Sequence, residues 1–225
     1  MSNVRILVGA QGGDEGKGKW IDVIAREADL VVRYQGGNNA GHTLYVNGEK
    51  VVLHLLPSGI FHEGQQSAIA AGCVVNPIVI MDEIDGQKSR TNLSPERLWV
   101  SARAHAITPW NIHLDELKEK NAASPIGTTK RGIGPTYGYK ADRIGLRLGH
   151  CVDSQARRRW ISQMTERTPG FKEHLEQNSE AWENFEAAAD RLAPFVCDAE
   201  SRVRKAADAG KHVLIEGAQG ALLDI

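Results

Sequence analysis

The order of apolar and polar positions near the amino terminus predicts a strand, a helix and a second strand. Residues 4–8 form a short, mostly apolar run, which is typical of a buried parallel strand. From Ile21 to about Ala28, apolar residues recur at helical spacing, so we expect an amphipathic helix there. Residues 30–34 are the next strand. A strand–helix–strand unit of this kind places its ligand at the carboxyl ends of the strands.

The remainder of the chain continues this mixture of strands and helices. Residues 44–46 and 51–55 flank Asn47-Gly48, and this dipeptide is the strongest short signal for a β-hairpin. Residues 126–149 are rich in glycine and are expected to form a loop. Further strand-like runs occupy residues 67–72, 98–101 and 211–215. Helical patterns occupy residues 109–120 and about 171–210, with an interruption near Pro194. We therefore predict an α/β fold with a mostly parallel central sheet and flanking helices.

Composition narrows the class of protein. The 225 residues are 41% hydrophobic and 24% charged, which is ordinary for a globular protein. A net charge of −1 argues against general affinity for nucleic acid or acidic membranes. We find neither a signal-peptide pattern nor an apolar run near the roughly 18 residues that a membrane helix needs. Cys73, Cys151 and Cys197 are widely spaced, which predicts free thiols in a reducing cytoplasm.

The strongest chemical signal is the segment Gly-Asp-Glu-Gly-Lys-Gly-Lys at residues 13–19, directly after the first strand. Glycines let the backbone approach phosphate oxygens, and the amides of the next helix attract the same anion. The segment fits the Walker A spacing, but Trp20 stands where a hydroxyl should bind the metal. We expect the carboxylate of Asp14 to replace it as a magnesium ligand. The alternative is a glycine-rich turn with solvated lysines.

A second polar segment, residues 38–43, brings His42 to the end of the second strand. A lone histidine is usually structural, but this one is expected at the same sheet edge as Asp14. A carboxylate and an imidazole that converge on one substrate form an acid/base pair. The tetrapeptide Gly-Ala-Gln-Gly occurs at residues 9–12 and again at 217–220, each time after a strand. We therefore expect two turns that face one pocket.

Several spaced segments carry a resemblance to a known family, in the family's order: residues 13–19, 39–43, 53–60, 127–129, 131–135 and 216–220. Together they resemble the adenylosuccinate synthetases, over residues 4–225 and about the amino-terminal half of a typical member. The resemblance implies GTP-dependent ligation of L-aspartate to inosine monophosphate through a 6-phosphoryl intermediate, which gives adenylosuccinate. It also implies Mg²⁺, a cytoplasmic homodimer, small-molecule substrates, and neither nucleic acid nor membrane as a partner. Residues 1–225 would then be a single partial domain of a longer synthetase fold.

The same resemblance assigns roles to individual residues. Asp14 would be the base and His42 the acid, and Lys17 would stabilise the transferred phosphoryl group. Asp14 and the carbonyl of Gly41 would bind the metal. Nucleotide contacts would come from Gly13, Asp14, Glu15, Gly16, Lys17, Gly18, Lys19, Gly41, His42 and Thr43. The purine mononucleotide would be bound by Asn39, Ala40, Thr129, Gln219 and, from the partner subunit, Arg143.

Some positions depart from the family pattern and leave alternatives open. Gly12, Asn38, Lys130 and Gly138-Tyr139 replace residues that the family usually has. One alternative is a related synthetase acting on deoxyguanylate, although the retained Asp14 favours inosine monophosphate. Another is a truncated, non-catalytic nucleotide-binding module, since the family's guanine and aspartate sites lie in its carboxyl-terminal half. A P-loop kinase or GTPase is disfavoured by Trp20.

Overall fold

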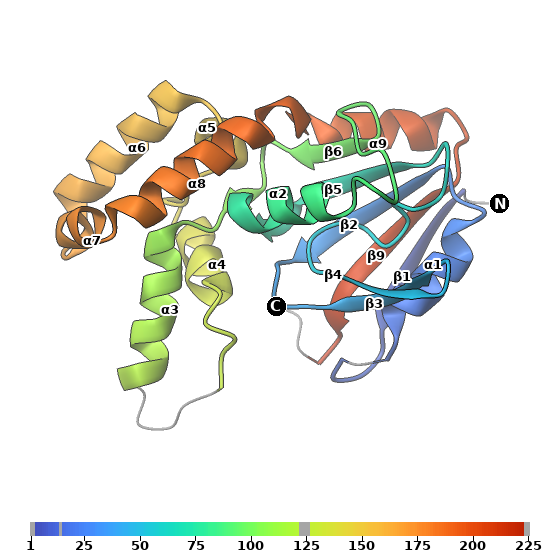
Figure 1. Cartoon of the computed structure of the whole chain (residues 1–225), viewed down its shortest axis with the longest axis horizontal. Helices are drawn as coiled ribbons and strands as arrows, with labels where there is room; N and C mark the ends of the chain where they lie inside the picture. The colour runs from blue at the N-terminus through green and yellow to red at the C-terminus, as the bar shows by residue number, and fades with distance from the viewer. Residues whose placement is uncertain (1–2, 14, 122–126, 223–225) are drawn as a thin grey trace.

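The computed structural model describes residues 3–13, 15–121 and 127–222, and its centre is a parallel β-sheet (Figure 1). The strands lie in the order β1-β9-β2-β5-β6-β8, with β7 paired to β5, and every pair within this sheet is parallel. The strands are β1 (Val4–Gly9), β2 (Leu30–Gly36), β5 (Gln66–Val75), β6 (Leu98–Ser101), β7 (His105–Ala106), β8 (Val196–Cys197) and β9 (Val213–Gly220). The predicted α/β fold with a mostly parallel central sheet is confirmed.

Helices cover both faces of this sheet and form a helical layer at one end of it (Figure 1). The α-helices are α1 (Lys17–Ala25), α2 (Pro77–Gly86), α3 (Pro109–Asn121), α4 (Ile133–Ala141), α5 (Leu148–Cys151), α6 (Ser154–Arg167), α7 (Phe171–Gln177), α8 (Ser179–Leu192) and α9 (Ala199–Asp208). A short 3₁₀ helix, η1, spans Ala193–Phe195. Among the described residues, no helix has the length and apolar character needed to cross a membrane.

The two faces of the sheet follow from the alternation of side chains along its strands. Val31 and Leu214 pack with Ile21 and Ala25 of α1. Their neighbours Leu30, Val32 and Val213 point the other way and pack with Ala199 and Ala206 of α9. Burial of Ile21 and Ala25 confirms the predicted amphipathic helix. This packing holds the amino terminus of α1 beside the carboxyl ends of β1 and β9.

A separate antiparallel hairpin lies beside the main sheet. It consists of β3 (His42–Val46) and β4 (Glu49–Leu53), with Val46 opposite Glu49. Both turn residues have positive φ, 50° at Asn47 and 85° at Gly48, as a two-residue type I′ turn requires. The hairpin predicted from Asn47-Gly48 is therefore confirmed. It begins at His42, so this turn helps to position a candidate catalytic side chain.

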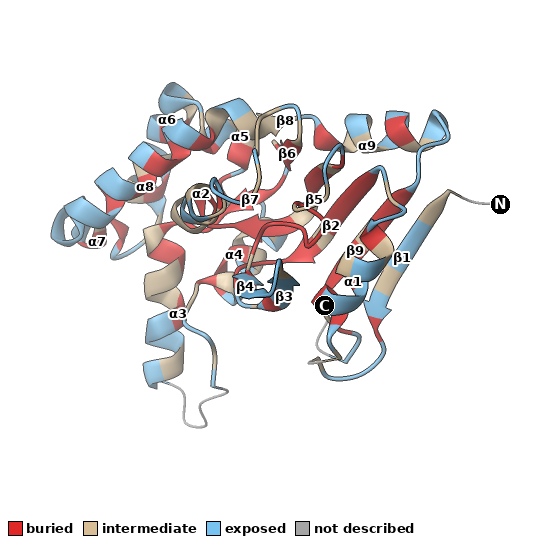
Figure 2. Cartoon of the chain, turned by 45° about the vertical axis from the view of Figure 1, so that its right-hand side comes forward, coloured by how far each residue is buried: buried red, intermediate tan, exposed pale blue. Residues whose placement is uncertain are grey.

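The prediction that residues 4–8 form a buried strand is wrong in one respect. Strand β1 is parallel, but it lies at the edge of the sheet, and in the described part of the chain its only strand neighbour is β9. Ile6 and Val8 are 62% and 58% exposed, and Figure 2 shows the exposed positions along this strand. An apolar run indicates that its residues favour burial, but it does not indicate whether the strand lies in the middle or at the edge of the sheet.

Residues 126–149 were expected to form a loop, and this expectation is also wrong. Ile126 lies outside the described residues, but residues 127–149 contain α4 and the start of α5. Gly134 and Gly138 lie within α4, where glycine weakens any sequence-based helix signal. Tertiary contacts compensate, because the hydroxyl of Tyr137 donates to the carbonyl of Gly72 at 2.9 Å. The interruption near Pro194 was expected, and the structure places η1 and the two-residue strand β8 there.

Candidate functional site

A cavity of about 420 Å³ opens at the carboxyl ends of β1, β2 and β9, and we name it the phosphate-loop cavity. It brings together residues from three separate segments of the chain. Those expected from the sequence are Gly13, Glu15, Gly16, Lys17, Gly18, Lys19, Asn39, Ala40, Gly41, His42, Thr43 and Gln219. Asp14, the predicted base and metal ligand, lies outside the described residues. The cavity is thus at the predicted edge of the sheet and combines both predicted motifs.

Glycine is required at two points where the loop enters α1. Gly16, the residue before the helix, has φ of 74°, a conformation that side chains with a Cβ rarely adopt. A Cβ on Gly18 would lie 2.8 Å from the Cβ of His42, so only glycine lets α1 approach β3 this closely. The amino terminus of α1 consequently lies against the cavity, where its free N–H groups attract anions.

The loop neutralises its own buried cation. Lys17 is 7% exposed, and its Nζ donates to the carboxylate of Glu15 at 2.7 Å. That carboxylate also accepts the N–H groups of Gln11 and Gly13, at 3.1 and 3.2 Å. The hydrogen bond from Lys17, together with those from the backbone, lowers the pKa of Glu15 to about 2. The loop therefore donates to the Glu15 carboxylate the same kind of hydrogen bonds that it would donate to a phosphate oxygen.

His42 is held in the cavity wall by a buried carboxylate. Its Nδ1 contacts the carboxylate of Glu216 on β9, and the hydroxyl of Ser58 lies 3.3 Å from the same nitrogen. Nε2 lies 3.4 Å from the carbonyl oxygen of Ala218, which also lines the cavity. His42 is 5% exposed and Glu216 is fully buried. The imidazole is therefore bound on both sides by β9 and the segment after β4.

Sequence reasoning assigned no role to Glu216 or Ser58, although both lie in segments that carried the family resemblance. A signal was available for Glu216, because it ends the apolar run Val213-Leu214-Ile215. An acid in a buried strand needs partners to offset the loss of hydration. Nothing in the sequence named His42 as that partner, since 174 positions separate the two residues.

The two Gly-Ala-Gln-Gly segments lie side by side, as expected. Gly9 is in register with Gly220, and Gly12, Ala218 and Gln219 line the same cavity. The second copy extends β9 to Gly220, so the prediction that it is a turn is wrong. A Cβ on Gly220 would lie 2.0 Å from the carbonyl oxygen of Gln11, which explains how glycine allows this close pairing.

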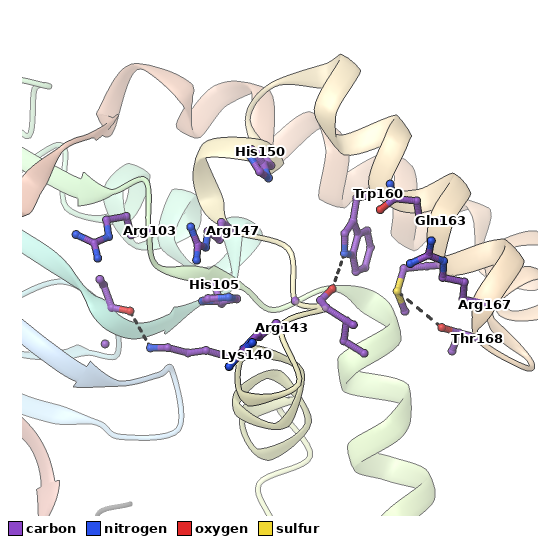
Figure 3. A pocket seen from close by; sticks show the side chains of 15 residues that line it. Arg103, His105, Lys140, Arg143, Arg147, His150, Trp160, Gln163, Arg167 and Thr168 are labelled. Carbon is purple, nitrogen blue, oxygen red and sulfur yellow. Dashed lines mark hydrogen bonds between the residues drawn. The ribbon is translucent and has the colours of Figure 1, made fainter.

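Two predicted substrate-binding residues lie elsewhere. Thr129 is exposed in the segment before α4 and does not line the phosphate-loop cavity. Arg143, with φ of 62°, lines a second cavity of about 870 Å³, which we name the basic cavity (Figure 3). Its cationic and imidazole side chains come from β7, α4, α5, α6 and the segments that connect them: Arg103, His105, Lys140, Arg143, Arg147, His150 and Arg167. Among the described residues that line it there is no Asp or Glu.

The family follows from comparison with known proteins. The sequence model of the family described as Adenylosuccinate synthetase matches residues 6–225. The chain belongs to the adenylosuccinate synthetase family. An adenylosuccinate synthetase of Anaeromyxobacter sp. (strain Fw109-5) is 46% identical over 235 residues, which cover 100% of the chain and 54% of that protein. The Acetivibrio thermocellus adenylosuccinate synthetase is 43% identical, over 98% of the chain and 53% of that protein.

A solved structure of an adenylosuccinate synthetase agrees with this assignment. Fully ligated adenylosuccinate synthetase from Plasmodium falciparum superposes with a TM-score of 0.86 at 35% identity, covering 100% of the chain and 53% of that protein. The cyanophage S-2L succinoaminodeoxyadenylate synthetase, bound to dGMP and dATP, has a TM-score of 0.63 at 20% identity and shows a shared fold alone. The chain thus spans about half the length of the adenylosuccinate synthetases that it matches.

Proposed function

We propose that the chain carries the phosphate-loop portion of a GTP-dependent ligase that joins L-aspartate to inosine monophosphate and forms a carbon–nitrogen bond. The observation that carries this proposal is the phosphate-loop cavity. Residues of the glycine-rich loop, of the segment 39–43 and of β9 line one hollow in a chain of this family. The cavity combines anion-binding amides, a buried lysine and a histidine, which are the groups that phosphoryl transfer needs.

In the proposed reaction, Asp14 removes the N1 proton of the purine and the 6-oxygen attacks the γ-phosphate of GTP. GDP leaves, with His42 acting as the acid beside the departing diphosphate oxygen. The amine of aspartate then displaces the 6-phosphate, which releases inorganic phosphate and adenylosuccinate. Lys17 would leave Glu15 and pair with the transferred phosphoryl group. The salt bridge of 2.7 Å between them supports this, because it holds the lysine ready within the cavity.

Mg²⁺ and the purine mononucleotide use the same cavity in this proposal. Magnesium prefers oxygen ligands, and the carbonyl of Gly41 together with Asp14 would hold it and neutralise phosphate charge. Gly41 is exposed and lines the cavity, which fits that role. Asn39, Ala40 and Gln219 would contact the purine mononucleotide from the same wall. Thr129 does not line this cavity and would join them only after its segment moves toward it.

Arg143 supports a homodimer as the working form. Its side chain lines the basic cavity and not the phosphate-loop cavity, so within one chain it is separate from the other substrate-binding candidates. We infer that it serves the purine mononucleotide of a partner subunit. A cytoplasmic location agrees with Cys73 and Cys151, which are buried free thiols whose pKa values burial raises to about 12.

The test is a coupled assay of the intact gene product with GTP, magnesium, aspartate and either inosine monophosphate or deoxyguanylate. We expect aspartate-dependent phosphate release with inosine monophosphate. Phosphate release only with deoxyguanylate would show that deoxyguanylate is the substrate. Nucleotide binding without phosphate release would identify a non-catalytic module. An Asp14→Asn variant should bind nucleotide but lose turnover, whereas unchanged turnover would refute its role as the base.

A further inference from the structure

A buried carboxylate that no proposed catalytic step uses lies directly against the proposed acid. Glu216 is fully buried near the end of β9, and its carboxylate contacts Nδ1 of His42. The same carboxylate accepts the backbone N–H of Ser58 at 2.9 Å and the hydroxyl of Ser58 at 2.8 Å. Three donors thus converge on one side chain. These bonds restrict the ring of His42 and offset the unfavourable burial of the carboxylate.

These contacts decide which ring nitrogen bears a hydrogen. Burial alone raises the pKa of Glu216, but the hydrogen bond and charge of His42, the charge of Arg33 and the Ser58 N–H outweigh it, so the pKa lies below its ordinary value. An ionised carboxylate only accepts hydrogen bonds. The single hydroxyl hydrogen of Ser58 is donated to Glu216, so toward Nδ1 this oxygen also only accepts. Nδ1 must therefore carry a hydrogen whether the imidazole is neutral or charged.

The other ring nitrogen is then the one available for chemistry. Nε2 lies on the side of Ala218, at 3.4 Å from its carbonyl oxygen, in the wall of the phosphate-loop cavity. With Nδ1 tied to Glu216, Nε2 is the nitrogen left to interact with a ligand. A carbonyl oxygen only accepts, so the contact with Ala218 is a hydrogen bond when Nε2 carries a hydrogen. The hydrogen bond at one nitrogen of a histidine commonly sets the role of the other in this way.

We propose that Glu216, assisted by Ser58, is a positioning residue that fixes the tautomer and orientation of His42, so that Nε2 is the ring nitrogen presented to the bound nucleotide. The inference rests on the proposed function, in which His42 is the acid. It adds a residue from the carboxyl-terminal strand β9 to the catalytic arrangement. Glu216 touches neither nucleotide nor metal in this proposal and acts only through His42.

A purely structural role for Glu216 would be to balance the buried charge of Arg33, its neighbour in register across β2 and β9. The contacts favour positioning. Arg33 donates to the carbonyl oxygens of His54 and Gly37, whereas the carboxylate of Glu216 accepts from His42 and Ser58. A variant that retains the charge but withdraws it from Nδ1 separates these two roles, and Glu216→Asp is that variant.

The first experiment is ¹⁵N NMR of histidine-labelled protein, with His42→Gln used to assign the resonance among the eight histidines. The spectrum reports which ring nitrogen of the neutral imidazole carries hydrogen. In the wild type we expect hydrogen on Nδ1, and its absence there would overturn the proposal. In Glu216→Gln, the amide keeps its bond to the Ser58 N–H only by turning its NH₂ toward Nδ1. The ring should then switch to hydrogen on Nε2.

Glu216→Asp should populate both tautomers, because its shorter side chain withdraws the carboxylate from Nδ1 while the charge near Arg33 remains. It also decides the question if Glu216→Gln does not fold. Glu83→Gln is the matched control, since Glu83 accepts the N–H groups of Leu55 and Leu56 in the neighbouring segment but does not contact His42. A folded Glu216 variant whose His42 keeps hydrogen on Nδ1 alone would refute the proposal.

The second experiment measures turnover of the intact gene product. We expect Glu216→Gln to lower kcat by about 10–100-fold while the KM for GTP changes by less than about threefold, with partial recovery in Glu216→Asp. If Glu216→Gln lowers kcat only together with the melting temperature, and Glu216→Asp is fully active, the role of Glu216 is structural and the proposal is overturned. If the wild type lacks ligase activity, the proposed function fails, but the NMR result still decides whether Glu216 fixes His42.

Discussion

The two cavities of this chain treat positive charge in opposite ways. In the phosphate-loop cavity, Lys17 pairs with Glu15, and His42 pairs with Glu216. In the basic cavity, five cationic side chains and two histidines gather without an acid among the described lining residues. The phosphate-loop cavity pairs Lys17 and His42 with acids of the same chain, whereas the basic cavity calls for an anion from elsewhere. The positions of the basic residues therefore indicate an anion site that the net charge of −1 does not reveal.

The largest expected effect comes from removing Lys17, the buried lysine of the phosphate-loop cavity. Lys17→Ala in the intact gene product should lower kcat/KM by about 10²–10³-fold, because a positioned donor to the transferred phosphoryl group is lost. The coupled phosphate-release assay measures it. Lys88→Ala is the control, since the exposed Lys88, which follows α2, pairs with Asp85 of that helix. A similar loss in both variants would show that the effect is not specific to the cavity.

The second prediction tests whether the basic cavity serves another subunit. Arg143→Ala should raise the KM for the purine mononucleotide by about 10–100-fold, since a charge-assisted hydrogen bond to phosphate is lost. Co-expression of Arg143→Ala with Asp14→Asn should restore activity, because each mixed dimer would contain one intact site. With random pairing about one quarter of the sites are intact. No recovery, or a monomer by light scattering, would contradict the shared site.

The third prediction concerns acid stability of the basic cavity. Burial, together with the charges of Lys140 and Arg147, lowers the pKa of His105 to about 4 from its ordinary 6.5. Between these values the unfolded chain binds a proton that the folded chain does not. Stability is therefore full above about pH 6.5 and falls toward pH 4, by about 2–3 kcal/mol for this residue.

Urea unfolding at several pH values, comparing the wild type with His105→Gln, measures this difference. The variant should lose less stability on acidification, because glutamine does not titrate. Curves of the two proteins that fall in parallel from pH 6.5 to 4 would show that His105 does not contribute. Adding inorganic phosphate during the same experiment asks whether an anion offsets the charge of the basic cavity.

The smallest predicted effect tests the ion pair between Lys17 and Glu15 in the phosphate-loop cavity. Glu15→Gln should bind diphosphate about tenfold more tightly, because the carboxylate no longer competes for Lys17 and the loop amides. Isothermal titration calorimetry measures the affinity. Glu27→Gln is a suitable control, since Glu27 pairs with Arg5 in an exposed ion pair. Weaker binding in Glu15→Gln would show that Glu15 organises the loop and does not compete with the anion.

Local sequence patterns predicted those parts of the site that depend on neighbouring residues. Asn47-Gly48 predicted the hairpin because asparagine and glycine readily adopt the positive φ that the turn requires, and both residues have it. The glycines near Lys17 predicted the loop at the start of α1. The same patterns failed for residues 126–149, where Gly134 and Gly138 lie inside α4. There the helix is supported by contacts with distant residues, such as the bond between Tyr137 and Gly72.

The sequence by itself determined the mostly parallel α/β fold, the family, and the two motifs expected at one edge of the sheet. The fold and the place of the motifs follow from short-range periodicity and spacing, which a single chain displays directly, whereas the family follows from the resemblance of several spaced segments to known sequences. Only the tertiary structure decided that β1 is an edge strand, that Arg143 lies apart from the phosphate loop, and that Glu216 holds His42. Each of these depends on strand order and on contacts between distant residues, and burial makes such contacts strong without leaving a local sequence pattern.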